Sequence, residues 1–380
     1  MRYFIIAGES SGDLHGSRLM QQLKAEDPEA QFRFLGGDKM TAAGGTPVVH
    51  CKEMAFMGFV TVLRNLRTIL AIEKRAQKAC IDFNPDKIIL IDYPSFNLRF
   101  AKFARKKISQ AEVIYYISPK LWAWKSWRIR NIKKYIHRMF TIFPFETDYY
   151  NKKGYTVTYV GNPSVDSVDD FNKHCPAERN NIFKIVNDKR PMVALLPGSR
   201  KQEIKDCLSK MCEATKQFDK YQFVIAAAPA IDRSFYEEIL KSTRTDKKQI
   251  KIIYNNTYKI LQQSKAAIVN SGTATLETAL FGIPQTVVYK VPGGKFTMLL
   301  KQIFIKTKYI SLVNILAEKE VVKELIGPLF TTEKIEKELH NLLDNKEYIS
   351  TIQTEYDKIK TSLGAPGAAH RLAKNIVTEQ

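Results

Sequence analysis

Two stretches of this 380-residue chain pass abruptly from an apolar strand into a glycine-containing loop and then into a helical pattern, at residues 4–13 (FIIAGESSGD) and 193–200 (VALLPGSR). In an open parallel sheet, loops of this kind lie outside the carboxyl ends of the strands, where ligands bind. At roughly 100–200 residues per domain, the length also fits two domains. We therefore expect two α/β domains that face a central ligand-binding cleft.

Apolar runs alternate with helical patterns along most of the chain, which supports this architecture. Strand patterns occur at residues 3–7, 32–35, 87–91, 112–117 and 139–142, and again at 192–196, 222–226, 251–253, 266–269 and 285–288. Strands separated by helices are typical of parallel βαβ units. The predicted fold class is α/β, with two Rossmann-like doubly wound domains.

The stretch at residues 161–176 has no clear period and contains two prolines and several aspartates, so it is expected to connect the halves. We place the boundary near residue 165, which gives a first domain at 1–165 and a second at 166–345. The pattern is helical from residue 332 onward. The helices of 346–380 are expected to pack back toward the first domain.

Lysine and arginine outnumber aspartate and glutamate by 59 to 39, for a formal charge of +20. Such a charge favours an anionic partner: nucleic acid, a phospholipid surface or a phosphorylated substrate. No run approaches the ~20 apolar residues of a transmembrane helix, and residues 1–7 predict a buried strand instead of a signal peptide. The five cysteines lack paired spacing, which favours reduced thiols in a cytosol over zinc or disulfides.

The turn after the strand pattern at 266–269 carries the small residues Ser271, Gly272 and Thr273. Small residues at a strand-to-helix turn let backbone amides approach a phosphate, which the helix dipole also attracts. Glu277, about one turn into the helix, is a candidate for binding ribose hydroxyls. The alternative is an ordinary turn in which Thr273 caps the helix and Glu277 complements its dipole.

The loop at residues 196–200 strengthens the phosphate interpretation, because it ends another strand of the same domain with Ser199 and Arg200. The guanidinium of Arg200 offers a planar fork that can bind a diphosphate with two parallel hydrogen bonds. The alternative is a solvated arginine at a helix start. A cation there opposes the helix dipole unless an anion offsets it, which weakens that alternative.

In the first half, Asp92 follows the strand pattern at 87–91 and precedes a proline-containing turn. A carboxylate at the carboxyl end of a central strand is a candidate general base, and the alternative is a turn or cap aspartate. The loop at 8–13 is expected on the same rim, where its polar side chains would lie on the acceptor side: Glu9, Ser10, Ser11 and Asp13. The alternative for Asp13 is a cap of the helix that begins at residue 14.

All three tryptophans lie among basic residues at 118–130, including Trp122 and Trp124. Aromatic side chains interleaved with lysine and arginine can stack on bases or lie at a membrane interface, and the alternative is a buried aromatic cluster beside a solvated basic helix. A second segment, 295–308, is apolar with lysine flanks, as in interfacial helices.

Neither basic segment carries a nucleic-acid-binding motif or zinc-finger spacing, which favours a lipid surface over nucleic acid. The loop at 8–13 lacks the Gly-Lys-Ser/Thr ending of a Walker A motif and is not the GxGxxG fingerprint. ATP hydrolysis and NAD-dependent hydride transfer are therefore disfavoured.

Six segments, in order along nearly the whole chain, resemble those of the lipid-A-disaccharide synthase family: residues 8–16 (GESSGDLHG), 91–97 (IDYPSFN), 116–124 (YISPKLWAW), 195–200 (LLPGSR), 271–277 (SGTATLE) and 309–314 (YISLVN). The resemblance implies a two-domain GT-B glycosyltransferase of glycosyltransferase family 19. It implies a cytoplasmic enzyme of a Gram-negative bacterium that lies peripherally on the inner face of the cytoplasmic membrane. Neither a metal nor another cofactor is expected.

The family's reaction joins UDP-2,3-diacylglucosamine to 2,3-diacylglucosamine 1-phosphate, which gives a β-1,6-linked disaccharide 1-phosphate and UDP. By the matching motifs, the first domain would bind the acceptor, and Asp92 would take the proton of its 6-hydroxyl. The second domain would bind the UDP-sugar through a set of residues shared with the family: Ser199, Arg200, Ser271, Gly272, Thr273 and Glu277. Asn314 matches a family position near that site, without an assigned role.

Some positions depart from the family pattern: Ser10, Lys120 and Asn162 stand where alanine, a small or polar residue and histidine are common. Lys120 is expected to alter contacts with the acceptor phosphate. Two alternatives remain: another GT-B enzyme acting on UDP-N-acetylglucosamine, as a 2-epimerase or a polyprenyl-linked transferase, and a non-catalytic basic protein that binds nucleic acid. The acyl-chain preference and the oligomeric state stay open, with a homodimer among the options.

Overall fold

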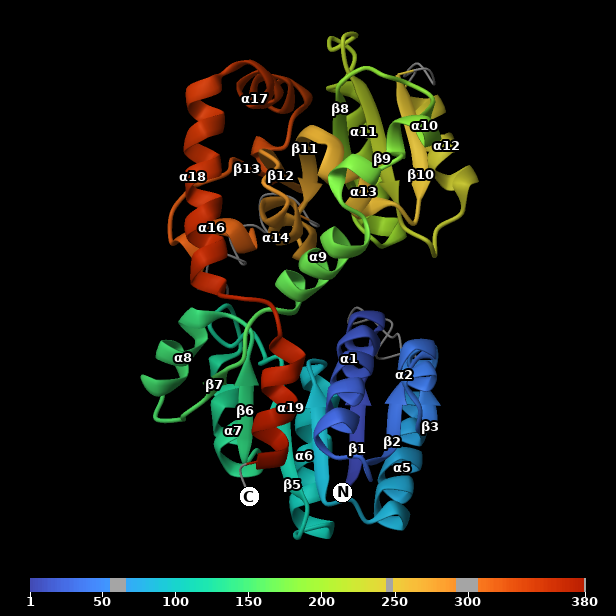
Figure 1. The fold of residues 1–380 in the computed structure, drawn as a ribbon, viewed down its shortest axis with the longest axis vertical. Helices are drawn as coiled ribbons and strands as arrows, with labels where there is room; N and C mark the ends of the chain where they lie inside the picture. The colour runs from blue at the N-terminus through green and yellow to red at the C-terminus, as the bar shows by residue number, and fades with distance from the viewer. Residues whose placement is uncertain (55–65, 244–248, 292–306, 379–380) are drawn as a thin grey trace. The chain divides into compact units, whose positions relative to one another are not determined.

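The computed structural model describes residues 1–54, 66–243, 249–291 and 307–378 (Figure 1). The chain divides into two compact units, Met1–Pro163 with Ala365–Gln380 (unit 1) and Ser164–Gly364 (unit 2). Each unit is built on one parallel sheet flanked by helices. The predicted fold class, two Rossmann-like α/β domains, is thereby confirmed.

The sheet of unit 1 has seven strands in the order β3-β2-β1-β4-β5-β6-β7. Their bounds are β1 (Arg2–Ala7), β2 (Gln31–Gly36), β3 (Thr46–His50), β4 (Lys87–Ile91), β5 (Glu112–Tyr116), β6 (Arg138–Thr141) and β7 (Thr158–Tyr159). β1 and β4 are neighbours, and Ala7 pairs with Ile91. The strands that follow β1 lie on one side of this pair, and the strands that follow β4 lie on the other, so the strand order reverses here. The loops that follow these two strands therefore lie at the switch point of the sheet, at its carboxyl edge.

Alternate side chains of β1 belong to different hydrophobic cores. Phe4 and Ile6 pack in the core that contains Phe100, whereas Tyr3 and Ile5 pack in the core that contains Leu19. The helices of unit 1 are α1 (Ser10–Glu26), α2 (Asp38–Ala43), α3 (Cys51–Met54), α5 (Leu66–Phe83), α6 (Pro94–Lys107), α7 (Ile129–Tyr135), α8 (Pro144–Asn151) and α19 (Ala368–Thr378), with the short 3₁₀ helix η1 (Ser126–Arg128). Because both faces are covered, the central strands are almost continuously apolar, as in other parallel sheets.

The sheet of unit 2 has six strands in the order β10-β9-β8-β11-β12-β13. Their bounds are β8 (Met192–Leu196), β9 (Gln222–Ala227), β10 (Ile250–Tyr254), β11 (Ser264–Asn270), β12 (Gln285–Tyr289) and β13 (Glu324–Ile326). The strand order reverses between β8 and β11, whose last paired residues are Leu196 and Val269. This unit thus has its own switch point, the usual ligand-binding place of such sheets.

The helices of unit 2 cover both faces of its sheet in the same way. They are α9 (Pro163–His174), α10 (Ile182–Val186), α11 (Lys201–Glu213), α12 (Arg233–Ser242), α13 (Thr257–Gln263), α14 (Thr273–Leu280), α16 (Leu312–Ala317), α17 (Thr332–Asp344) and α18 (Lys346–Leu363), with the 3₁₀ helices η2 (Ala177–Arg179) and η3 (Gly327–Leu329). Within the described residues, no helix is both long and apolar enough to cross a membrane.

The C-terminal segment 346–380 is shared between the units: α18 belongs to unit 2, whereas α19 packs against α1 in unit 1. Nε of Arg371, in α19, donates to the carbonyl of Val160 at 2.8 Å. The guanidinium of Arg371 also fills the space beside Gly161, whose φ of +100° favours glycine and where a Cβ would collide with it. This helix is therefore an integral part of unit 1.

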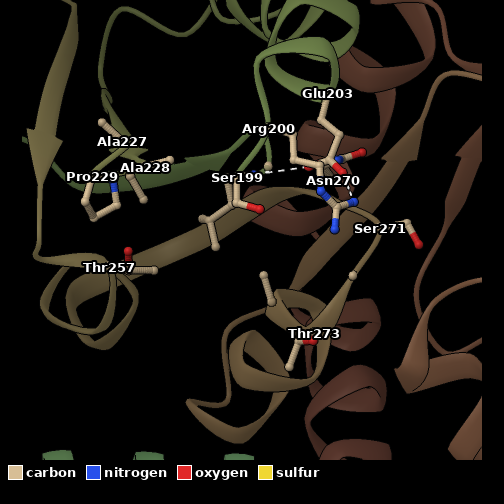
Figure 2. A pocket seen from close by; sticks show the side chains of 15 residues that line it. Ser199, Arg200, Glu203, Ala227, Ala228, Pro229, Thr257, Asn270, Ser271 and Thr273 are labelled. Carbon is tan, nitrogen blue, oxygen red and sulfur yellow. Dashed lines mark hydrogen bonds and ion pairs between the residues drawn. The ribbon is translucent and has the colours of Figure 1, made fainter. Parts of the chain in front are cut away.

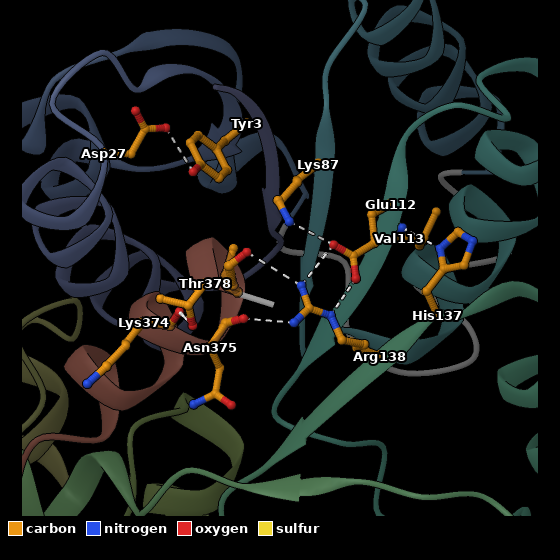
Figure 3. Close-up of polar contacts among 11 residues, drawn as sticks. Tyr3, Asp27, Lys87, Glu112, Val113, His137, Arg138, Lys374, Asn375 and Thr378 are labelled. Carbon is orange, nitrogen blue, oxygen red and sulfur yellow. Dashed lines mark hydrogen bonds and ion pairs between the residues drawn. The ribbon is translucent and has the colours of Figure 1, made fainter. Parts of the chain in front are cut away.

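A polar network at the amino ends of β4, β5 and β6 holds α19 in place (Figure 3). Glu112 accepts from Lys87 Nζ at 2.9 Å and from Arg138 Nη2 at 2.8 Å, and Arg138 Nη1 donates to the carbonyl of Asn375 at 2.7 Å. Burial raises the pKa of Glu112, but the hydrogen bonds from Arg138 and Lys87 outweigh it and lower the pKa overall. A cation at the C-terminus of α19 also complements the helix dipole.

Candidate active site

A pocket of about 410 Å³ lies in unit 2 at the carboxyl ends of β8, β9 and β11 (Figure 2). It is bounded by the loops after these strands and by the first residues of α13 and α14, and its lining consists of Leu196, Gly198, Ser199, Arg200, Glu203, Ala226, Ala227, Ala228, Pro229, Thr257, Asn270, Ser271, Gly272, Thr273 and Ala274. The pocket exists because the strand order reverses between β8 and β11, which makes their loops diverge.

The sequence prediction named several of these lining residues, and the structure brings them together: Ser199, Arg200, Ser271, Gly272 and Thr273. It also adds Glu203 and Asn270, which the sequence analysis did not single out. Asn270 ends β11 and is 5% exposed, and its Oδ1 accepts from Cys207 Sγ at 3.5 Å. The sequence signal that could have identified Asn270 is its position as the last residue of a buried strand.

The turn after β8 depends on Gly198, which has φ +111°. A Cβ at this position would lie 2.6 Å from Glu203 Oε2 and 2.8 Å from Asn270 Nδ2. Both the left-handed backbone and these close neighbours exclude a side chain. The turn thus brings the backbone itself against the floor of the pocket.

Ser199 and Arg200 both bind Glu203, on the first turn of α11. The backbone N–H of Ser199 donates to Glu203 Oε2 at 3.1 Å, and Arg200 Nη1 donates to Glu203 Oε1 at 2.8 Å (Figure 2). The side chain of Arg200 is 56% exposed. A guanidinium and a backbone donor therefore converge on one carboxylate at the pocket rim.

On the opposite side, the turn before α14 is held by hydrogen bonds from Ser271 to two backbone carbonyls. Ser271 N donates to the carbonyl of Val288 at 3.1 Å, and Ser271 Oγ to the carbonyl of Ile310 at 3.3 Å. Gly272 occupies the N-cap position of α14, no side chain caps the helix, and a Cβ on Gly272 would have no neighbour within 4 Å. The predicted alternative of Thr273 as N-cap is therefore wrong.

Glu277 lies one turn into α14, outside the residues that line the pocket. Its Oε1 accepts from the hydroxyl of Tyr258 at 2.6 Å, and the ring of Tyr258 packs edge-on against Phe171 and Phe281. Burial raises the pKa of Glu277, and the bond from Tyr258 lowers it in part. The carboxylate is thus fixed beneath the α14 turn.

Asn314 is fully buried and does not line the pocket. Its Oδ1 accepts from the backbone of Val321 and Val322, and its Nδ2 donates to the carbonyl of Val322 at 2.8 Å and to Glu324 Oε1 at 3.0 Å. All the hydrogen-bonding capacity of an amide is engaged in these four bonds. The side chain of Asn314 therefore holds the surrounding backbone in place and has no hydrogen-bonding group left for a ligand.

Glu324 links Asn314 to the pocket, and the sequence analysis missed it. Its carboxylate accepts from the backbone of Ile310 and from both the N–H and the hydroxyl of Ser311. The carbonyl of Ile310 in turn accepts from Ser271 Oγ. No local pattern marks a glutamate at the start of a three-residue strand, so sequence alone offered no signal.

In unit 1, Asp92 and Tyr93 follow β4 and both have φ +46°. Consecutive left-handed residues that are not glycine are uncommon and are typically held by their surroundings. Here Asp92 N donates to the carbonyl of Tyr116 at 3.0 Å, and the carbonyl of Asp92 accepts from Asn97 Nδ2 at 2.6 Å and from the hydroxyl of Tyr115. The backbone of Asp92 is therefore rigidly positioned.

The residue Asp92 itself is exposed to solvent. The protein atoms that surround its carboxyl nevertheless raise its pKa by desolvation, against the opposing charge of Lys120 and a hydrogen bond from the backbone of Tyr93. A solvent-accessible carboxylate with a raised pKa is a more effective proton acceptor than an ordinary aspartate. The geometry thus suits the predicted role of a general base.

The loop after β1 lies beside this turn, where the ring of Tyr93 covers Gly8. Glu9 is the N-cap residue of α1 without a side-chain cap bond, and its charge contributes to the raised pKa of Tyr93 after burial. Ser10 and Ser11 begin α1 and are exposed. These three residues lie at the carboxyl edge of the sheet, as the sequence predicted for this loop.

Asp13, in contrast, is 6% exposed and faces α2. Its Oδ1 accepts from the N–H groups of Gly37 at 2.7 Å and Met40 at 3.0 Å, and its Oδ2 accepts from Lys39 N at 3.1 Å. The carboxylate thus caps the N-terminus of α2, which explains its burial. It does not cap its own helix, so that predicted alternative is wrong.

The tryptophans divide into two environments. Trp122 donates through Nε1 to Glu146 Oε1 at 3.1 Å and packs edge-on against Phe145. Glu146 is buried and also accepts hydrogen bonds from Ser118, Ile142 and Phe143. The sequence analysis missed this residue because its hydrogen-bond donors lie 3 to 28 residues away along the chain. Burial raises the pKa of Glu146, against these hydrogen bonds. The Trp122 side chain is thus held in one position by Glu146 and Phe145.

Trp124 and Trp127 are 51% and 62% exposed. The Lys125 Nζ lies 4.3 Å from the centre of the Trp124 ring, and the guanidinium carbon of Arg128 lies 5.8 Å from that of Trp127. Lys125 is exposed as well, whereas Arg128 is half-buried; we call these four aromatic and cationic side chains the Trp–Lys patch. Most of the second predicted segment, 295–308, lies outside the described residues.

Among the described residues, no group of three or more histidine, cysteine, aspartate or glutamate side chains could hold a metal ion. The polar chemistry of both sites is instead made of hydroxyls, a guanidinium, backbone amides and carboxylates. Such groups bind and orient phosphates and sugars and move protons.

A model of the lipid-A-disaccharide synthetase family matches residues 3–376. A lipid-A-disaccharide synthase from Syntrophus aciditrophicus is 37% identical over 378 residues, which cover 98% of this chain and 96% of the relative. The match therefore extends through both units.

Solved structures with the same fold have low sequence identity. A UDP-N-acetylglucosamine 2-epimerase from Neisseria meningitidis, solved with UDP-N-acetylglucosamine bound, is 12% identical with a TM-score of 0.65, and the match covers all of both chains. A calicheamicin glycosyltransferase is 12% identical with a TM-score of 0.59, over 99% of this chain and 97% of that chain. These similarities concern the fold, which is the predicted GT-B fold.

Proposed function

Since the chain belongs to the lipid-A-disaccharide synthetase family, we propose that unit 2 binds the UDP-sugar donor, unit 1 binds the acceptor, and Asp92 is the base of the reaction. The protein is a glycosyltransferase that forms the disaccharide of lipid A. The specific substrates we propose are UDP-2,3-diacylglucosamine and 2,3-diacylglucosamine 1-phosphate. The observation that carries the donor assignment is the pocket between the β8 and β11 loops.

The pocket has the groups that a nucleotide diphosphate requires. Arg200 and the backbone around Ser199 supply donors at one rim, and the turn of Ser271 and Gly272 leads into the positive end of α14 on the other. Donors of this kind offset the charge that develops on a leaving diphosphate. We assign Glu277 to the ribose hydroxyls and Asn314, through Glu324 and Ile310, to the positioning of Ser271.

The proposed reaction is a single displacement. The acceptor's 6-hydroxyl oxygen forms a bond to the anomeric carbon of the donor while the bond from that carbon to the diphosphate breaks. The electron pair leaves with UDP, the hydroxyl proton passes to Asp92, and the configuration inverts. The rigid backbone of Asp92 fixes the position of its carboxylate, and the raised pKa makes that carboxylate a stronger proton acceptor; both features support this role.

We further propose that Lys120 and the exposed residues of the 8–11 loop contact the polar part of the acceptor. Lys120 is exposed and close enough to Asp92 to lower the pKa of its carboxyl. Trp122 would form a wall of the same region. The acyl chains of both substrates, the net charge of +20 and the Trp–Lys patch support a location on the cytoplasmic face of the inner membrane.

The direct test is an assay of the purified protein with both proposed substrates, with the disaccharide 1-phosphate and UDP as products. Formation of both in equal amounts, dependent on the acceptor, is the expected result. Omission of the acceptor controls for hydrolysis of the donor. Release of no disaccharide, or conversion of UDP-N-acetylglucosamine alone into its 2-epimer, would overturn the proposal.

A further inference from the structure

The anion-binding groups at the rim of the unit 2 pocket already hold an anion, the carboxylate of Glu203. One of its oxygens binds the N–H of Ser199 at 3.1 Å and the other binds Arg200 Nη1 at 2.8 Å. Glu203 itself lines the pocket. The donors that would hold a diphosphate are thus engaged with a side chain of the same unit.

The surroundings of this carboxylate have the features of an anion site. Gly198 leaves the space that Glu203 Oε2 occupies, since a Cβ there would lie 2.6 Å from that oxygen. Asn270 Nδ2 lies on the same side, 2.8 Å from the same position. A guanidinium, a backbone N–H and a glycine turn together make a concavity for an anion.

We propose that Glu203 is an internal counter-ion that occupies the diphosphate site of the empty enzyme and is displaced when the nucleotide binds. This inference rests on the proposed donor site. A diphosphate and a carboxylate repel each other at such short distances, so both cannot share the Ser199 and Arg200 donors. Rotation of the Glu203 side chain, which is only partly buried, releases those donors to the nucleotide.

One consequence for the reaction is that Glu203 competes with UDP after transfer, so that UDP leaves more readily. The competing explanation is a permanent helix cap, because Glu203 is the third residue of α11 and glutamate there commonly bonds back to the start of its helix.

The test is calorimetric titration of UDP and of uridine into the wild-type protein and Glu203→Gln. The amide is the same size and keeps an acceptor for Ser199 N, but it lacks the charge. We expect UDP to bind about threefold to fivefold more tightly to Glu203→Gln, in the range of exposed ion pairs. The affinity for uridine, which has no diphosphate, should not change. UDP should also become a stronger product inhibitor.

The matched control is Glu237→Gln, which removes a carboxylate paired with Arg233 on α12, away from the residues that line the pocket. It should bind UDP as the wild type does. Unchanged or weaker UDP binding by Glu203→Gln, with uridine still bound, would identify a permanent cap and overturn the inference alone. A wild-type protein that binds neither ligand would overturn the donor site itself.

Discussion

The ring of Tyr93 lies directly over Gly8, so that a Cβ on Gly8 would come within 2.8 Å of Tyr93 Cε1 and closer still to other ring atoms. The hydroxyl of Tyr93 donates to the carbonyl of Met54 at 2.9 Å, which holds the ring in this position. The loops after β1 and β4, at the switch point of unit 1, are therefore packed against each other. Asp92, immediately before Tyr93, depends on that packing.

Gly8→Ala should strongly reduce turnover, while the protein stays folded with a lower free energy of unfolding. The added methyl group must displace the Tyr93 ring, and overpacking of this kind costs about 1–3 kcal/mol of unfolding free energy. Because Asp92 is adjacent in a constrained turn, its carboxylate should move with the ring. Turnover and thermal unfolding, measured on the same Gly8→Ala protein, separate the two effects. Full activity of Gly8→Ala would contradict the packing argument.

Asp92→Asn should lower kcat by about 10²–10⁴, the usual contribution of a general base. UDP affinity should not change. Because the folded protein raises the pKa of Asp92, its ionised form opposes folding above that pKa, and the variant should be as stable as the wild type or slightly more stable at neutral pH. Asp82→Asn, on an exposed position of α5, is the control. Wild-type turnover in Asp92→Asn would exclude the base role.

The same pKa shift predicts the acid limb of the activity profile. The base must be deprotonated, so kcat/KM should fall as the pH drops through the raised pKa of Asp92, at a higher pH than an ordinary aspartate would give. Lys120 opposes the shift, so Lys120→Met should move the acid limb to still higher pH. A profile of kcat/KM against pH for both proteins measures this. An acid limb that Lys120→Met moves to lower pH would contradict the assignment.

Arg200→Ala should weaken UDP binding while uridine binding stays the same. Charged hydrogen bonds contribute about 1.5–3 kcal/mol when desolvated, and the 56% exposure of Arg200 places its contribution at the lower end. Titration of both ligands measures the difference. Arg233→Ala, from an exposed ion pair on α12, should leave both affinities intact. Equal loss of uridine binding would indicate a collapsed pocket instead of a lost phosphate contact.

Arg138→Met should destabilise unit 1 by about 2–4 kcal/mol, somewhat less than the loss of a fully buried ion pair, because Arg138 and Glu112 are partly exposed. It leaves Glu112 with Lys87 alone and removes the bond to the α19 carbonyl of Asn375. Glu112 has a lowered pKa, so its contribution is present above the pKa of an unfolded glutamate, near 4.3, and is lost as the pH falls through the folded value.

Chemical denaturation at neutral and acid pH measures this effect. The difference between Arg138→Met and the wild type should shrink as the pH falls below the pKa of an unfolded glutamate and then through the lowered pKa that Glu112 has in the folded wild type. Lys24→Met, which removes an exposed side-chain bond to the carbonyl of Ala43, is a control for loss of a surface cation. A constant difference at all pH values would assign the effect to packing instead of charge.

The double variant Trp124→Ala, Trp127→Ala should bind anionic vesicles more weakly without a change in melting temperature. Both rings are more than half exposed, so their removal leaves no cavity. Sedimentation with vesicles of anionic or zwitterionic lipid at low salt gives the measurement. The wild type should bind only the anionic vesicles, because the +20 charge contributes most of the attraction. A wild type that binds neither would refute the membrane proposal.

Much of the fold could be predicted because the central strands are buried on both faces and therefore stand out as apolar runs. The strands that the sequence analysis did not name lie at the edges of the sheets: β3, β7 and β13. Each has one neighbouring strand. β7 and β13 are only two and three residues long, and β3 is mostly exposed or half-buried, so none of them shows a clear period. The 112–117 strand pattern overran the structure at Ile117, whose φ of +63° ends β5.

The loops of the two sites could be located from sequence because a glycine turn after a buried strand always lies at the carboxyl edge of a parallel sheet. Residue types and their neighbours thus determined the fold class, the pocket lining at Ser199, Arg200, Ser271, Gly272 and Thr273, and the exposed position of Asp92.

Only the tertiary structure decided which polar side chains form hydrogen bonds with backbone groups that are distant in sequence and which line a candidate site. Asp13 caps a helix 24 to 27 residues away, and Asn314 and Glu324 hold a turn against Ser271 across two elements. Glu203 occupies the Ser199 and Arg200 donors because Gly198 leaves room for it. A carboxylate or amide has the same chemistry wherever it stands in a sequence, and only the fold brings its partners within hydrogen-bonding distance.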